Sequence, residues 1–466
     1  MYSIPEKEYA EKSSIKSVSN FYDKYKLGSA LKASNMYKQK GVPVAVVIKY
    51  LISLIYTGKS MFQDMRGEKP LAQGFGMDTV YRLLNRASVD WRSFLLNIAR
   101  KVVDEIDGLT SDTRRSAFVI DDTMYEVLYA KKTELVSKVY DHAAKGGSKF
   151  KWGFRLLTLG WTDGVSFIPL AYRHLASSDE KNLRYKHGAR PDKRSRAYRI
   201  RNEAVSKATE VMFILLKAAL KSGVSAKYVL FDTWFAYPAT VIKTASLGLY
   251  AVCRVKDTTK IKYLVNGKRK TAREIFKENK KRRGKSRYLL SVGVTLYNAE
   301  SGETLPARLV YVRNRQRRNE WVALVCTDPD LTEDEIIALY GKRRDIEVFF
   351  KVCKSYLKLT REFQQLSYDA LNAHTAIVMT RYMILSTEKR KTEDPRSLGD
   401  LFFSCYDEAA DIKFEQALLL LMILLAETLR DVGVGLSEEQ IDMIMDGFIE
   451  KLPSYMRDCL QPDFVA

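Results

Sequence analysis

Four polar side chains in the last third of the sequence recur at a helical spacing. Tyr340, Arg343, Glu347 and Lys354 follow one another at intervals of three, four and seven residues. On a helix of about 3.6 residues per turn they share one face, and the apolar positions of 336–357 predict one amphipathic helix. A carboxylate among cations suits a divalent ion bound beside phosphates. A solvated helix face with ordinary ion pairs explains the same residues equally well.

Two further sets of carboxylates follow apolar runs that read as strands. The first run ends in Asp121 and Asp122, and the second ends in Asp232. An acid at the carboxyl end of a central strand lies where open α/β sheets place their ligands. Together with Glu347, such acids form a hard-oxygen site for two Mg²⁺ or Mn²⁺ ions, which activate a nucleophile for attack on a phosphodiester. For either strand alone, a turn residue or a helix cap is an equally good explanation.

The elements around these acids predict a mixed sheet with flanking helices. Asp163-Gly164 is a hairpin turn signal between two apolar runs. Residues 1–110 are typical of helices, and three strands after residue 287 follow a basic stretch. The predicted elements are strands at 116–123, 152–159 and 165–172, a helix ending near Lys221, a strand at 228–233, a helix at 238–247, and strands at 249–255, 288–297, 307–313 and 321–327.

Charge is distributed unevenly along the chain. The net charge is +21, from 77 Lys and Arg against 56 Asp and Glu, and such basicity favours a polyanionic partner such as nucleic acid. Residues 254–287 hold fifteen basic and three acidic residues, whereas residues 393–466 hold sixteen acids and five bases. The middle of the chain is therefore expected to contact DNA, and the acidic C-terminal part to contact protein.

Cysteine, histidine and apolar patterns exclude several classes of protein. The five cysteines are scattered without a CxxC pair, and none of the four histidines has metal-ligand spacing from a cysteine. Structural zinc and a disulfide framework are thus not expected. The N-terminus lacks the apolar stretch of a signal peptide, and the longest apolar run, 417–426, is too short to cross a bilayer. We expect a soluble protein of a reducing compartment.

A short basic helix in the N-terminal part is a candidate DNA-reading element. Residues 77–86 carry Arg82 and Arg86 after a Gly-Phe-Gly turn, which suits a helix that reads DNA. A purely structural bundle is an equally good explanation, so the helix that would read DNA stays open.

Three motifs together resemble the DDE transposases of bacterial insertion sequences, specifically the insertion-sequence 4 family. They are Asp121-Asp122-Thr123, the Phe-Asp-Thr-Trp-Phe segment at 231–235, and the Tyr-x2-Arg-x3-Glu-x6-Lys signature ending at Lys354. The resemblance covers residues 115–360, and the signature is its most specific part. Because Asp122-Thr123 also fits the first motif, Asp121 is preferred as the first acid but Asp122 stays open.

The resemblance implies an α/β fold with an RNase H-like catalytic core, a β-rich insertion and all-helical terminal domains. The implied metal ligands are Asp121, Asp232 and Glu347, binding two Mg²⁺ or Mn²⁺ ions. The implied DNA contacts are Tyr340, Arg343, Arg344 and Lys354, with Trp321 stacking on a flipped base unless it is a core residue. The implied domains are a helical DNA-binding domain at 1–112, the catalytic core at 113–256 and 331–388, a basic β-rich insertion at 257–330, and an acidic helical dimerisation region at 389–466.

The function implied by the resemblance is cut-and-paste DNA transposition. Such a protein binds transposon ends and target DNA as a homodimer in the bacterial cytoplasm, at the nucleoid, without a membrane or nucleotide cofactor. Two alternatives are a transposase-derived DNA-binding protein without catalysis and an RNase H-like nuclease without strand transfer.

Overall fold

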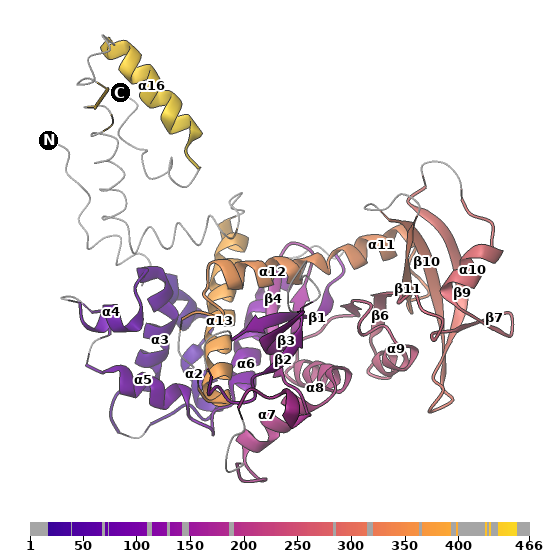
Figure 1. The fold of residues 1–466 in the computed structure, drawn as a ribbon, viewed down its shortest axis with the longest axis horizontal. Helices are drawn as coiled ribbons and strands as arrows, with labels where there is room; N and C mark the ends of the chain where they lie inside the picture. Colours follow the sequence, from indigo (N-terminus) through magenta and orange to yellow (C-terminus); the bar gives the residue numbers. More distant parts are fainter. Residues whose placement is uncertain are drawn as a thin grey trace. The chain divides into compact units, whose positions relative to one another are not determined.

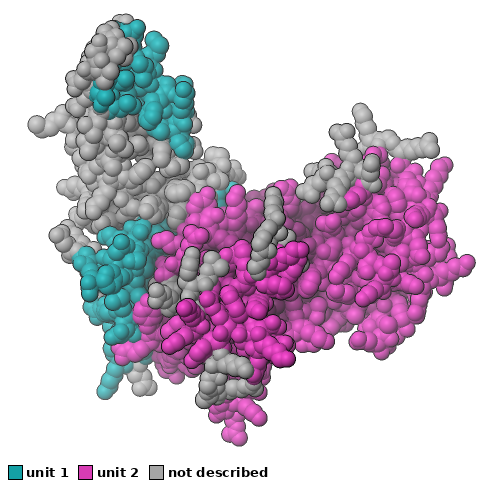
Figure 2. Space-filling model, viewed as in Figure 1, with its two compact units in different colours: residues 1–28, 38–80, 387–466 teal, residues 29–37, 81–386 magenta. Residues whose placement is uncertain are grey.

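The structure is a computed structural model whose contacts divide the chain into two compact units. One unit comprises residues 1–28, 38–80 and 387–466, and the other comprises residues 29–37 and 81–386 (Figure 2). The residues described are 17–38, 40–67, 70–72, 74–109, 114–127, 131–141, 149–185, 191–282, 286–314, 320–362, 366–392, 398, 425, 428–429 and 437–453. Among these residues, no helix combines the length and apolar character needed to cross a membrane.

The first unit is helical in its described part. Its helices are α3 (Val44–Leu54), η1 (Ile55–Thr57), α4 (Met61–Met65) and α16 (Glu438–Lys451), while α2 (Leu27–Ala33), α5 (Met77–Leu84) and α13 (Tyr368–Thr392) cross the boundaries between the units. The helix predicted at 77–86 is present as α5. Most of the proposed dimerisation region, including most of the apolar run 417–426, lies outside the described residues.

The second unit is built on one mixed sheet of eleven strands. Their order is β2-β3-β1-β5-β6-β11-β10-β9-β7-β8, with β4 also paired to β3. The strands are β1 (Ala117–Glu126), β2 (Ser137–Tyr140), β3 (Phe150–Thr162), β4 (Phe167–Leu175), β5 (Tyr228–Phe231), β6 (Tyr250–Arg254), β7 (Tyr263–Val265), β8 (Lys268–Lys270), β9 (Tyr288–Tyr297), β10 (Thr304–Arg313) and β11 (Trp321–Cys326).

The centre of this sheet is parallel, and its flanks are antiparallel. Strands β1, β5 and β6 run parallel, while β3 is antiparallel to both β1 and β4. The predicted hairpin turn between β3 and β4 is confirmed: Gly164 has a φ of 92°, and Asp163 Oδ1 accepts hydrogen bonds from the amides of Val165 and Ser166 at 2.9 and 2.7 Å. Asp163 is therefore accounted for by its turn.

The basic β-rich segment is part of the main sheet. Strand β11 pairs antiparallel with β6, and β10, β9, β7 and β8 continue outward from it. The segment also contains a helix, α10 (Ala272–Glu278), which begins with a capping box between Thr271 and Glu274. The three strands after residue 287 were predicted from the sequence, but their pairing with the sheet that carries the candidate acids was not.

Helices of the second unit pack against strands of this sheet. The helices are α6 (Trp91–Gly108), α7 (Arg196–Val205), α8 (Ala208–Lys221), α9 (Pro238–Ala245), α11 (Glu333–Gly341) and α12 (Arg344–Ser355). Helices α6 and α7 pack on β4, α8 packs on β3 and β4, and α9 packs on β6 and β9. Helices α11 and α12 follow one another along the sheet, α11 against β6 and β11 and α12 against β1 (Figure 1).

The prediction of one continuous helix over 336–357 is wrong at a single place. The chain tightens between α11 and α12, where the amides of Lys342, Arg343 and Asp345 each bond to the carbonyl three residues before, as in a 3₁₀ turn. Gly341 weakens the helix here. In addition, Lys342 Nζ bonds to the carbonyls of Arg115 and Asp163 at 2.6 and 2.9 Å, so tertiary contacts fix the break.

Candidate active site

The first candidate acid, Asp121, stands where a buried strand becomes accessible. Residues 117–120 of β1 are fully buried, and Asp121 and Asp122 follow with 18% of each side chain exposed. Since successive residues of a strand point to opposite faces, the two acids take different partners. Asp121 pairs with Arg343 at 2.6 Å, whereas Asp122 pairs with Arg155 on β3.

The second candidate acid, Asp232, lies beside Asp121 across the parallel pair of strands. Ile120 is in register with Phe231, so each strand delivers its acid at the same level of the sheet. The negative charge of Asp232 acts on Asp121 and on Tyr340 of α11. Two strands more than a hundred residues apart in the chain thus bring two carboxylates together where the parallel pairing of β1 and β5 ends. The expectation that the first acids end their strand is wrong, because β1 stays paired with β3 as far as Glu126.

The third candidate acid, Glu347, reaches this edge through Arg343. The Arg343 guanidinium donates to Asp121 Oδ2 through Nη1 and to Glu347 Oε1 through Nη2. Glu347 lies one turn into α12, and 53% of its side chain is exposed. Arg343 therefore bridges a strand acid and the helix acid, and its own pKa is raised: burial alone would lower it, but the neighbouring Tyr340 and acids outweigh that effect.

Burial is the main influence on the ionisation of Asp121. Burial raises the pKa of Asp121 from 3.8 to about 6; Arg343 and the amide of Asp122 oppose that rise, and the charges of Asp122 and Asp232 add to it. Because even a direct ion pair with Arg343 does not restore the ordinary pKa, the carboxylates favour a further cation nearby.

The remaining signature residues lie around the same strand. Lys354 Nζ donates to Thr123 Oγ1 at 2.7 Å, two residues beyond Asp121, and burial lowers the pKa of Lys354. Burial likewise raises the pKa of Tyr340, and Asp232 raises it further. The structure thus gathers Tyr340, Arg343 and Glu347 at the acids and places Lys354 farther along β1.

The two remaining predicted DNA contacts are Trp321 and Arg344. Trp321 is the first residue of β11 and is half-buried; its ring centroid is 5.3 Å from that of Phe276 and 5.0 Å from that of Tyr311. Arg344 is exposed as the first residue of α12. The sequence reading missed Arg155, whose position opposite Met124 in the β1–β3 pair becomes apparent only once that register is known.

The donor set suits a hard divalent cation in its chemistry. All three candidate ligands are carboxylates, the ligand type that Mg²⁺ and Mn²⁺ prefer. Within the described part of the chain, no three His, Cys, Asp or Glu side chains are grouped closely enough to hold a metal ion together. The guanidinium of Arg343 bridges Asp121 and Glu347 instead.

Comparison with known proteins identifies one family. Residues 58–293, just over half of the chain, match the model of a family described as DDE superfamily endonuclease. The matched span contains Asp121 and Asp232, while Glu347 lies beyond it. No curated protein sequence matches the chain.

Proposed function

The chain belongs to the DDE superfamily endonucleases, and on this basis we propose that it is a transposase that cuts transposon-end DNA and joins the freed end to a target. The observation that carries the proposal is that Asp121 of β1 lies beside Asp232, the residue that follows the adjacent parallel β5, and that Arg343 joins Asp121 to Glu347. Acids from two strands and one helix form the constellation that family membership and the insertion-sequence resemblance both lead us to expect.

We further propose that this part of the chain is an RNase H-like core. The support is its topology: an antiparallel β4-β3-β1 group joined to parallel β5 and β6, with α12 packed on β1. In this proposal the strands from β11 to β8 form the basic insertion. Its lysines and arginines add sequence-independent affinity for DNA that weakens as salt rises.

In the proposed site Asp121, Asp232 and Glu347 hold two divalent ions, Mg²⁺ or Mn²⁺. When bound, such ions supply Lewis-acid activation of the attacking hydroxyl and neutralise charge on the leaving oxygen. The carboxylates must be ionised for this role, and with a pKa of about 6 Asp121 is largely ionised at neutral pH.

The cations of the site have a separate task in the proposal. Arg343 would exchange its carboxylate partners for a phosphate of the DNA strand, because a guanidinium pairs with phosphate oxygens in a bidentate manner. Lys354, Arg344 and the hydroxyl of Tyr340 bind neighbouring phosphates and fix the strand in register. Trp321 is the proposed stacking partner of a flipped base, and two chains pair two ends as a homodimer in the bacterial cytoplasm.

The proposal is tested with labelled DNA from either side of the coding sequence and a target plasmid. Wild type, Glu347→Gln and Asp334→Asn are compared with Mg²⁺ or Mn²⁺. The Asp334 substitution is the matched control, since this acid on α11 is 61% exposed and its nearest cation, Arg287, is 3.9 Å away. We expect Glu347→Gln to bind DNA while cutting about a thousandfold more slowly, and Asp334→Asn to cut and join like wild type.

Other results would separate the alternatives. Full activity of Glu347→Gln would contradict the assignment of Glu347. Cutting by wild type without joined products would leave a nuclease without strand transfer, and binding without cutting would leave a catalytically silent DNA-binding protein.

A further inference from the structure

A cluster of aromatic and cationic side chains lies next to the acids. We call Arg155, Trp234, Tyr237 and Lys256 the edge cluster; they come from β3, from the loop after β5 and from the segment after β6. Trp234 is 45% exposed and Tyr237 is 40% exposed, a large exposed area for aromatic side chains, which are highly buried on average. Their exposure costs hydrophobic stabilisation, so it points to a ligand.

The two cations of the edge cluster are held against these rings. Lys256 Nζ lies 5.6 Å from the centroid of each ring, and 3.4 Å from Tyr237 Oη. The Arg155 guanidinium lies 4.7 Å from the centroid of Trp234 while it pairs with Asp122. Arg155 thus has its charge neutralised by Asp122 and positions the indole. Among the described residues, no carboxylate forms an ion pair with Lys256, so its ammonium group is available to a phosphate.

The edge cluster continues the candidate active site. Trp234 follows Asp232 by two residues, and the Asp122 that binds Arg155 directly follows Asp121. Strands β5 and β6 end here, at Phe231 and Arg254, and the parallel pairing of β1 with β5 ends at Ile120, while β1 itself continues to Glu126. A DNA strand whose phosphate lies at the acids therefore has its adjacent nucleotides within reach of the edge cluster.

We infer that the edge cluster binds an unpaired nucleotide of the DNA strand, with its base stacked on Trp234 or Tyr237 and its phosphate at Lys256. This inference rests on the proposed function. An exposed indole offers a stacking platform to any base, whereas bases inside a duplex are already stacked on their neighbours. The cluster therefore selects strand ends and single strands, the form that DNA takes beside a cut.

The test measures binding of a short single-stranded oligodeoxynucleotide that carries 2-aminopurine, whose fluorescence falls when it stacks on an aromatic ring. The full chain carries Glu347→Gln to prevent cutting, alone or with Trp234→Ala, Trp234→Phe or Phe448→Ala. Phe448 is the matched control because this ring on α16 is 40% exposed, close to the 45% of Trp234. Urea unfolding of each variant shows whether it is folded.

We expect Trp234→Ala to weaken single-strand binding by about tenfold to a hundredfold and to abolish the quenching. Trp234→Phe keeps a ring on which a base can stack, so it should retain most of both signals. Blunt duplex binding changes little in either variant, and Phe448→Ala behaves like the parent.

The outcomes separate this inference from the proposed function. If wild type cuts DNA but Trp234→Ala and Trp234→Phe bind and quench like the parent, the inference is overturned and the endonuclease stands. If quenching depends on Trp234 but wild type never cuts, the nucleotide site stands and the enzymatic proposal fails. If the parent neither binds nor quenches the oligonucleotide, the inference is overturned.

Discussion

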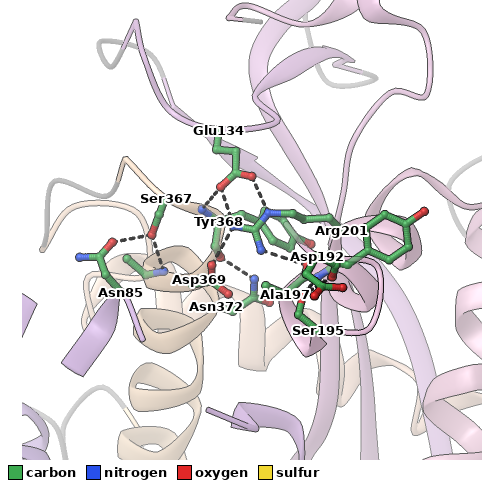
Figure 3. A network of polar contacts seen from close by, with 12 residues as sticks. Asn85, Glu134, Asp192, Ser195, Ala197, Arg201, Ser367, Tyr368, Asp369 and Asn372 are labelled. Atoms are coloured by element: carbon green, nitrogen blue, oxygen red, sulfur yellow. Dashed lines mark hydrogen bonds and ion pairs between the residues drawn. The ribbon is translucent and has the colours of Figure 1, made fainter. Parts of the chain in front are cut away.

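Two arginines in the second unit each join two carboxylates, and their surroundings differ in exposure to solvent and in the number of nearby acids. Arg201 on α7 donates to Glu134 Oε2 and Asp369 Oδ2 at 2.7 Å each, and to the carbonyl of Ala197 at 3.0 Å (Figure 3). Glu134 also accepts from the amide of Tyr368 at 2.8 Å. All three charged side chains are at most 15% exposed. This network ties a loop, α7 and α13 together.

Arg343 has the same kind of partners but more acid around it. It pairs with Asp121 and Glu347 while Asp232 lies beside them, so three carboxylates face one guanidinium. The pKa of Asp121 is raised to about 6 by burial, and more than half of the Glu347 side chain is exposed. The buried Arg201 network, with two acids for one cation, builds structure. The Arg343 network, with three acids and open to solvent, accepts a further cation at a cost in stability.

The largest effect is expected from breaking the buried Arg201 network. Arg201→Met leaves Glu134 and Asp369 buried without their cation, so we expect unfolding free energy to fall by about 3–5 kcal/mol. Urea unfolding measures this loss. Arg199→Met on the same helix is the control, since Arg199 is exposed and its loss should change stability by less than about 0.5 kcal/mol. Equal stability of the two variants would show that the Arg201 network is not structural.

The acid-rich network should respond to neutralisation with the opposite sign. The pKa of the Asp121 carboxyl group is 3.8 in an unfolded chain and about 6 in the folded protein. Because the folded state holds the proton more tightly, wild type loses stability as the pH rises from about 4 to about 6. Asp121→Asn does not titrate, and without metal we expect it to gain about 1–3 kcal/mol over wild type at pH 8 and little at pH 4.

Urea unfolding in the presence of a chelator at the two pH values checks this gain. Asp369→Asn, in the buried Arg201 network, is the matched comparison and should instead lose about 1–3 kcal/mol, because it gives up a charged hydrogen bond to Arg201. If Asp121→Asn were also less stable at pH 8, the contrast between the two networks would be lost.

The smallest effect is expected for the helix acid. Glu347→Gln removes an exposed i,i+4 pair with Arg343, and such pairs contribute about 0.3–0.5 kcal/mol. Its unfolding midpoint in urea should therefore stay close to that of wild type, in spite of the expected loss of cutting. A drop of several kcal/mol would mean that Glu347 acts in folding, and activity data on this variant would lose their meaning.

The local parts of the site were predictable from the sequence, and the long-range parts were not. The apolar runs predicted strands β1 and β5 and the acids beside them, because the apolar character of each residue indicates whether it is buried. Whether Asp121 or Asp122 faces Arg343 depends on the sheet register, which joins strands far apart in the chain. The break before Arg343 depends on bonds from Lys342 to the backbone at Arg115 and Asp163, which no helical periodicity contains.

The pairing of β11 with β6 also has a consequence for handling the protein. Without β11, the edge of β6 would present unpaired amide and carbonyl groups flanked by the apolar Val252 and Cys253. Such an edge is a template for strand addition between molecules. A shortened chain lacking 257–330 would therefore be expected to aggregate, so the insertion protects solubility as well as carrying charge.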